Sequence, residues 1–190
     1  MGKFKSSLTA MAVVVALGAC SEQKAPETTS TDVQNTATSQ QAQFDNVLLQ
    51  EFKGPYGGVP AFDKMNLEDL KPALEKAMEL NLKEIEAIAN NEAPPTFENV
   101  IVEMERAGAE LGRVFTYYGI WSSNKSSPEF REIQAEMSPK LSAFFTQITQ
   151  NEKLFERVKT VYESDELKSL TPEEQRITWM TYNSFARNGA

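Results

Sequence analysis

The sequence of 190 residues is long enough for one ordinary globular domain, and 41% of its residues are hydrophobic. Its 27 acidic side chains outnumber the 19 basic ones, which gives a formal net charge of −8 at pH 7. This composition lacks the basic surface typical of nucleic-acid binders, so we expect no nucleic-acid partner. Histidine is absent, and Cys20 is the single cysteine, which excludes an internal disulfide.

Residues 1–20 have the order of an export signal. Lys3 and Lys5 come first, and an apolar run over 8–19, too short to span a bilayer, follows them. The ending Leu-Gly-Ala-Cys at 17–20 resembles the bacterial lipoprotein signal, in which the cysteine is acylated after cleavage. The resemblance implies a signal peptide over 1–20 and lipid attachment at Cys20. A plain secretory signal or a buried amphipathic start are the alternatives.

Residues 21–43 contain mostly small polar side chains and cannot bury enough apolar surface to fold, so we expect a disordered tether of about 25 Å root-mean-square length. Ser21 follows Cys20 where an aspartate would retain a lipoprotein in the inner membrane. By this analogy the protein is exported and anchored in an outer membrane, facing the periplasm. Residues 44–190 alone sum to −8, because the +2 of residues 1–20 and the −2 of the tether cancel. An acidic body is weakly repelled by anionic lipid, so membrane contact is expected through the acyl chains.

The segment 44–65 mixes apolar side chains with five turn-forming residues, namely Gly54, Pro55, Gly57, Gly58 and Pro60. This composition predicts an irregular segment laid over apolar surface. A phosphate-binding loop is the functional alternative, but no strand precedes these glycines and no Gly-Lys-Ser/Thr follows them. We therefore interpret them as turns.

A first long helix is predicted from Glu68 or Asp69 to the Asn90-Asn91 pair, because Pro72 is tolerated only in the first turn. A second helix, capped by Thr96, is predicted over 96–124. The apolar positions of the first are Leu74, Ala77, Met78, Leu82, Ile85, Ile88 and Ala89. Those of the second recur at intervals of three, four or seven: Ile101, Met104, Leu111, Val114, Phe115, Tyr118 and Trp121.

A third helix is predicted to begin with Ser127 as its cap and Pro128 at its first position. Its apolar stripe continues past Pro139, which predicts one helix kinked over 135–138, because proline removes a backbone donor and clashes with the preceding turn. The stripe consists of Phe130, Ile133, Met137, Leu141, Phe144, Phe145 and Ile148.

Asn151 is predicted to cap a fourth helix. The sequence Thr-Pro-Glu-Glu at 171–174 is a capping box with proline at the first helical position, and it predicts the start of a fifth helix. Gly189 is predicted to end that helix. The apolar positions are Leu154, Phe155, Val158, Val161 and Tyr162 in the fourth, and Ile177, Met180 and Phe185, with Tyr182 at the edge, in the fifth. No alternating strand pattern and no fixed repeat occurs in the sequence. The predicted fold class is therefore all-α.

Five segments carry a family resemblance by their order and spacing: LLQEFKGPYGGVPAFDKM, PPTFENVIVEMERAG, GIWSSNKSSPEFREIQAEMSPKL, ITQNEKLFERVKTVYES and LTPEEQRITWMTYNSFARNGA. They resemble the amino-terminal region of the thimet oligopeptidase family of zinc metallopeptidases, most closely its bacterial peptidyl-dipeptidase and oligopeptidase A branch. The resemblance covers 44–190 and departs at Val47, where the family often has proline. It implies that 44–190 is the helical amino-terminal portion of a larger, two-lobed, mostly helical zinc peptidase.

The family resemblance also implies a channel that admits only short, unstructured peptides. In the family, a His-Glu-x-x-His helix and a later glutamate bind zinc downstream of this region. The zinc ion polarises the scissile carbonyl, and the glutamate of the motif activates water. Because this sequence has no histidine, we expect no catalytic residue and no metal ligand in it, and no activity of the chain alone.

Four glutamates at helical spacing are candidates for a carboxylate pair: Glu98, Glu103, Glu105 and Glu110. Arg106 and Arg113 lie among them, which favours a solvated face with weak ion pairs. Tyr117, Tyr118 and Trp121 are candidates for channel contact, but aromatic residues at helical spacing are more often core. We name none of these residues as a site.

Three hypotheses follow from the sequence. The first is the amino-terminal portion of a lipid-anchored zinc oligopeptidase, truncated or incompletely recorded and inactive alone. The second is a stand-alone, membrane-tethered helical interaction module without catalysis. The third is an enzyme completed by a separately encoded carboxy-terminal half.

Overall fold

The computed structural model describes residues 46–54 and 58–189, so the predicted signal, the predicted tether and Cys20 lie outside the described residues. The described residues form no strand, and Lys53 and Val59 form an isolated antiparallel bridge. The predicted all-α class is confirmed. The elements in chain order are η1 (Val47–Leu49), η2 (Leu67–Asp69), α2 (Leu70–Ala89), η3 (Phe97–Val102), α3 (Glu103–Arg106), α4 (Ala109–Asn124), α5 (Pro128–Thr149), α6 (Glu152–Glu163), η4 (Glu166–Ser169) and α7 (Pro172–Arg187).

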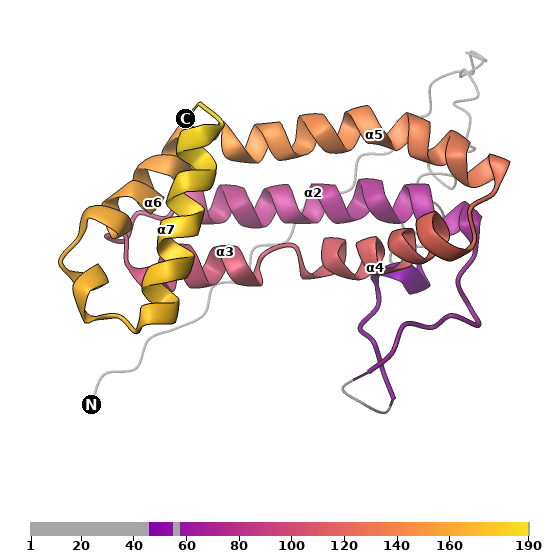
Figure 1. The fold of residues 1–190 in the computed structure, drawn as a ribbon, viewed down its shortest axis with the longest axis horizontal. Coiled ribbons are helices and arrows are strands. Elements are labelled where there is room, and N and C mark those ends of the chain that lie inside the picture. The colour runs from indigo at the N-terminus through magenta and orange to yellow at the C-terminus, as the bar shows by residue number, and fades with distance from the viewer. Residues whose placement is uncertain (1–45, 55–57, 190) are drawn as a thin grey trace, which may run out of the picture.

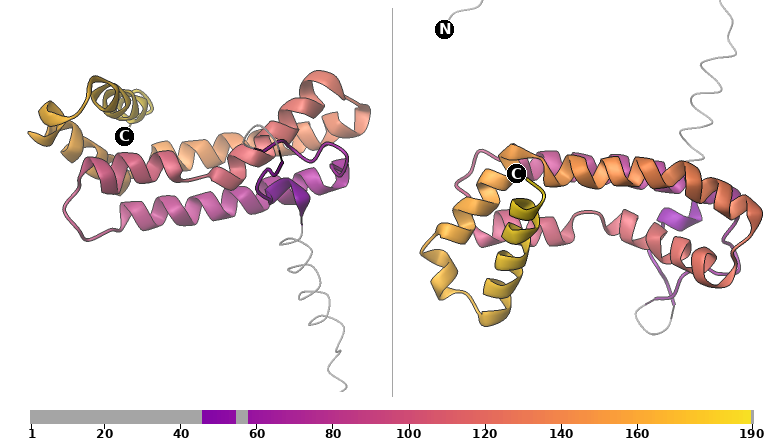
Figure 2. Two further views of the ribbon diagram at one scale, coloured as in Figure 1. Left: turned by 90° about the horizontal axis from the view of Figure 1, so that it is seen from below. Right: turned by 45° about the horizontal axis from the view of Figure 1, so that its top comes forward.

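Three long helices, α2, α4 and α5, lie along the long axis of the molecule, and α6 and α7 cross it at one end (Figure 1). In the view from below, α6 and α7 stand to one side of this layer (Figure 2). The molecule therefore has an inside corner where α7 passes α3 and the carboxyl-terminal end of α5 (Figure 1).

Two separate hydrophobic cores hold these helices together, and α2 contributes to both. The first core consists of Leu48, Leu70, Ala73, Leu74, Ala77, Leu111, Val114, Tyr117, Trp121, Phe130, Met137 and Phe144. The second consists of Ile85, Ile88, Ala89, Phe97, Val100, Ile101, Leu154, Val158, Val161 and Phe185. Burying each large apolar side chain stabilises by about 1.5 to 3 kcal/mol before entropy is subtracted, so both ends of α2 are strongly held.

The predicted helix caps are confirmed. The Ser127 hydroxyl accepts from the Phe130 amide at 3.2 Å, and the Asn151 side chain accepts from the Leu154 amide at 3.0 Å. Thr171 and Glu174 form the predicted reciprocal capping box. Thr96 forms a second box with Asn99, and Gly189 has a φ of 86°, as expected of a residue that ends a helix.

The predicted single helix over 96–124 is wrong. The chain begins there as η3, a π-helical segment, continues as α3, and breaks at Ala107, which is extended, and Gly108, whose φ of 78° favours glycine. The periodicity concealed this break because Met104 and Leu111 are seven residues apart, which also fits an unbroken helix.

The helix through Pro139 is continuous, as predicted, and its ribbon bends downward toward its amino-terminal end (Figure 1). Two positions of the predicted apolar stripes are exposed instead of buried. Phe145 on α5 is 48% exposed and Met180 on α7 is 53% exposed. Phe144 and Phe185 on the same helices are buried, because each helix is rotated so that these side chains face the cores.

The irregular segment before α2 is laid over the first core, as predicted. The Ala61 amide donates to the Tyr117 hydroxyl at 2.8 Å, and the Arg113 guanidinium donates to the Leu49 carbonyl at 3.0 Å. These bonds fasten an irregular segment to α4, so its backbone groups are paired without a sheet.

Candidate functional site

The aromatic candidates for channel contact belong mainly to the core. Tyr117 and Trp121 are 1% and 4% exposed within the first core. Tyr118 is half-buried beside that core, and its hydroxyl accepts from the Gln134 amide at 3.0 Å. The core interpretation is therefore confirmed for Tyr117 and Trp121, and neither presents a surface to a peptide.

The glutamates of 96–124 form a solvated face with ion pairs, as predicted, except that Glu110 and its partner Arg113 are partly buried. Arg106 contacts Glu103 at 2.7 Å and Glu98 at 3.3 Å, and its pKa is raised chiefly by the hydrogen bond to Glu103. Arg113 pairs with Glu110 at 2.7 Å, and Glu105 is exposed. Within 46–54 and 58–189, no three His, Cys, Asp or Glu side chains come together as metal ligands, so these residues do not fit a zinc site.

No helix within 46–54 and 58–189 combines the length and the apolar character needed to span a membrane.

A buried cation, Arg157, is a residue that the sequence alone did not reveal. It is 8% exposed, and its guanidinium donates to the carbonyl oxygens of Asn91 at 2.6 Å and Ala93 at 3.0 Å, and to Asn99 Oδ1 at 3.1 Å. Burial lowers its pKa. Arg157 therefore holds the connection between α2 and η3 against α6, a structural role.

The inside corner beside α7 contains a groove of about 630 Å³, which we call the corner groove. Met104 of α3 and Ile148 of α5 form one side of it, and α7 forms the other. Glu105 and Glu173 lie at its border. The α7 residues that line it include Ile177, Met180, Thr181 and Phe185.

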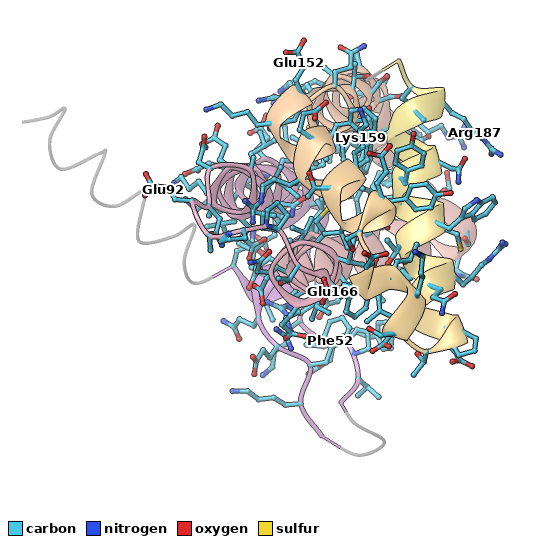
Figure 3. The ribbon with its side chains drawn as sticks, turned by 90° about the vertical axis from the view of Figure 1, so that its left-hand side faces the viewer. Phe52, Glu92, Glu152, Lys159, Glu166 and Arg187 are labelled. Atoms are coloured by element: carbon cyan, nitrogen blue, oxygen red, sulfur yellow. The ribbon has the colours of Figure 1, made fainter. Side chains whose placement is uncertain are left out.

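A second groove, of about 470 Å³, shares Arg176, Met180 and Ser184 with the corner groove, and we call it the flank groove. Its lining contains the side chains of Arg176 and Arg187 and no carboxylate. The Arg176 guanidinium lies 4.5 Å from the centre of the Trp179 ring, which is a cation–π contact. Figure 3 shows Arg187 pointing away from the body of the molecule at the outer side of α7.

The outer face of α7, defined as Arg176, Trp179, Met180 and Arg187, thus separates two grooves. The sequence predicted Met180 as core because it lies three residues after Ile177. One sequence signal could have identified this face. Arg176 precedes the apolar pair Trp179-Met180, and Arg187 follows it on the same helix.

Comparison with known proteins identifies the fold. Residues 70–189 match the family described as the N-terminal domain of neurolysin/thimet oligopeptidase. The dipeptidyl carboxypeptidase of Salmonella typhimurium is 30% identical over 145 residues, which are 76% of this chain and 21% of that relative. Oligopeptidase A of Escherichia coli is 28% identical over 144 residues, which are 76% of this chain and 20% of that relative.

A more distant relative, the organellar oligopeptidase A of Arabidopsis thaliana, is 24% identical over 145 residues, which are 75% of this chain and 17% of the relative. The chain thus spans about a fifth of the length of the curated relatives it matches. The family match includes every described helix from α2 to α7. The chain belongs to the neurolysin/thimet oligopeptidase family and contains its N-terminal domain.

Proposed function

We propose that this chain is the amino-terminal part of a zinc metallopeptidase that hydrolyses short, unstructured oligopeptides in a peptidyl-dipeptidase-like manner. The observation that carries the proposal is the match of residues 70–189 to an N-terminal domain of peptidases. Relatives named dipeptidyl carboxypeptidase and oligopeptidase A support the substrate class.

The catalytic metal centre is proposed to lie outside residues 1–190. The sequence has no histidine, and the residues within 46–54 and 58–189 do not assemble a ligand group. The proposed contribution of these helices is to form part of one of two lobes that limit access to a peptide channel.

The experiment is to express the gene with any coding sequence that follows codon 190 and, separately, residues 1–190. Zinc content and hydrolysis of a blocked oligopeptide are measured for both, with and without a chelator. We expect zinc and chelator-sensitive hydrolysis in the longer product and neither in residues 1–190. Chelator-sensitive hydrolysis by residues 1–190 alone would contradict the assignment of the metal centre, and a longer product without hydrolysis would contradict the peptidase.

We also propose that Cys20 carries the lipid that anchors the protein in the outer membrane, facing the periplasm, with 21–43 as a tether. The charged, apolar and small residues of 1–20 support this anchor. A Cys20→Ser variant is expected to move from the membrane fraction to the soluble periplasmic fraction. If the variant stays in the membrane fraction, the anchor lies elsewhere.

A stand-alone, membrane-tethered helical interaction module is the second candidate. It is favoured by one observation, the two hydrophobic cores that the described residues form among themselves. This candidate predicts that residues 1–190 are the whole gene product and show a sharp thermal transition without added partners.

A further inference from the structure

We propose that the outer face of α7 is a docking surface for an acidic, amphipathic segment of the catalytic part of the same peptidase. The inference rests on the proposed function and names the partner for this domain. It is carried by the two grooves beside Met180, by the exposed apolar side chains between them, and by the charges that border them.

Helix α7 leaves apolar area uncovered. The helix already buries one face, since Thr178 and Phe185 are 0% and 2% exposed. Its opposite face still exposes Trp179 to 38% and Met180 to 53%. Two large apolar residues side by side, between a corner groove and a flank groove, form a patch and not a scattered exposure. Methionine adapts its shape to a partner surface, and tryptophan contributes a large contact area.

The outer face of α7 also carries positive charge, through Arg176 and Arg187. The described residues provide no ion-pair partner for Arg176 or Arg187, although the whole chain carries a formal charge of −8. Because the lining of the flank groove has no carboxylate, this groove favours a partner that supplies carboxylates. Arginine is well suited to this role, since its planar guanidinium binds a carboxylate through two hydrogen bonds.

The charges also orient the partner. Glu105, Glu173 and Arg176 line the corner groove, so two carboxylates there stand against one guanidinium and disfavour an acidic side chain. The segment therefore places its apolar residues in the corner groove, against Met104 and Ile148, and its carboxylates over the flank groove. A helix with apolar residues at intervals of three or four and acidic residues beside them has this pattern.

The proposed segment comes from the same peptidase. The matched stretch is about a fifth of each relative, so a protein of the relatives' size has far more chain available to cover this face. A second copy of this chain is disfavoured, because a two-fold contact through α7 would bring Arg176 and Arg187 of both copies together. We therefore assign the catalytic part of the peptidase as the partner that covers the exposed apolar side chains and pairs with the two arginines.

The test is site-specific photo-crosslinking in the protein expressed with any coding sequence that follows codon 190. The photoreactive amino acid p-benzoylphenylalanine replaces Met180, and in a matched control it replaces Phe62, which is 49% exposed in the segment before α2. Crosslinked peptides are identified by mass spectrometry. We expect position 180, and not position 62, to crosslink to an acidic peptide of the catalytic part.

Charge reversal provides the second measurement. The double variant Arg176→Glu with Arg187→Glu is expected to lower the crosslinking yield at position 180 by about tenfold, since it replaces attraction with repulsion at two points. The matched control is Lys125→Glu with Arg131→Glu, two exposed cations where α4 meets α5, with the same change in net charge. The control is expected to leave the yield unchanged.

Three results would overturn the inference: no crosslink at position 180, crosslinks only to 46–189 of a second copy, or equal losses in both double variants. Zinc content and peptide hydrolysis are measured on the same samples. Hydrolysis without the crosslink would remove the docking surface and leave the proposed function intact. If the protein without substitutions does not hydrolyse the peptide, that result would instead contradict the proposed function.

Discussion

The Glu84 carboxylate accepts a hydrogen bond from the backbone amide of Gly108 at 2.7 Å. Glu84 lies on α2, and Gly108 lies at the break between α3 and α4, where an amide at the start of a helix has no partner within its own helix. A side chain of α2 thus provides a hydrogen-bond acceptor for the backbone amide that the break between α3 and α4 leaves without a partner. The Asn81 amide lies 3.4 Å from the same carboxylate oxygen.

Glu84→Ala is expected to lower the free energy of unfolding by about 1 to 3 kcal/mol, because the Gly108 amide loses its acceptor in a partly buried place. Glu84→Gln keeps an acceptor oxygen and should cost less. Urea unfolding measures both, with Glu86→Ala, an exposed position on the same helix, as the control. Equal losses for Glu84→Ala and Glu86→Ala would show that the bond contributes nothing.

Gly108→Ala is expected to destabilise the protein by about 1 to 2 kcal/mol, because alanine disfavours positive φ. The added Cβ would also lie 3.0 Å from the Asn81 amide nitrogen. Gly112→Ala is the matched control, since a Cβ there meets nothing within 4 Å and the residue is inside α4. It should stabilise by about 0.5 to 1 kcal/mol. Thermal unfolding of the two variants should therefore shift in opposite directions.

Arg157→Ala is expected to cost about 3 kcal/mol or more, because two carbonyl oxygens and the Asn99 side chain lose a charged donor in a buried site. Arg157→Lys should also destabilise, since an ammonium cannot reproduce the guanidinium geometry. Lys159→Ala, on the same helix, is the control for loss of a cation. Unfolding in urea with an unchanged slope but a lower midpoint is the expected result.

The pH dependence of stability can be tested at Glu79, whose pKa is lowered to about 2 by hydrogen bonds from Lys83 and Lys76. A carboxyl with a lowered pKa in the folded state stabilises fully above its ordinary pKa of 4.5, and this stabilisation is lost as pH falls toward 2. Because the side chain is 49% exposed, solvent screening keeps the contribution below about 1 kcal/mol.

The measurement at Glu79 is the difference in unfolding free energy between the natural protein and Glu79→Gln, at neutral pH and at about pH 3. The difference should shrink at the lower pH and again in about 1 M salt. Glu92→Gln, which removes an exposed carboxylate, is the control for the change in net charge. A difference that grows on acidification would mean that the lysines do not stabilise the Glu79 carboxylate.

The features that the sequence predicted well depend on neighbours in the chain. Ser127, Asn151 and Thr171 cap their helices through residues three positions away, so local rules identify them. The features that it missed depend on distant contacts. The break at Gly108 is paired by a residue 24 positions away, and the contacts of Arg157 span 58 to 66 positions.

The outer face of α7 was missed for a related reason. Periodicity shows that Met180 shares a side of the helix with Ile177, but only the rotation of α7 against α6 and η3 decides which side is buried. The family, in contrast, was predictable because the resembling segments extend over nearly all the described chain.

The shared position of α2 has a consequence for the folding of the whole domain. Its Leu70 half belongs to the first core and its Ile85 half to the second, within one unbroken helix of 20 residues. Loss of structure in either core therefore removes support from the other through this helix. We expect the amide hydrogens in the middle of α2 to exchange with solvent more slowly than those at its two ends.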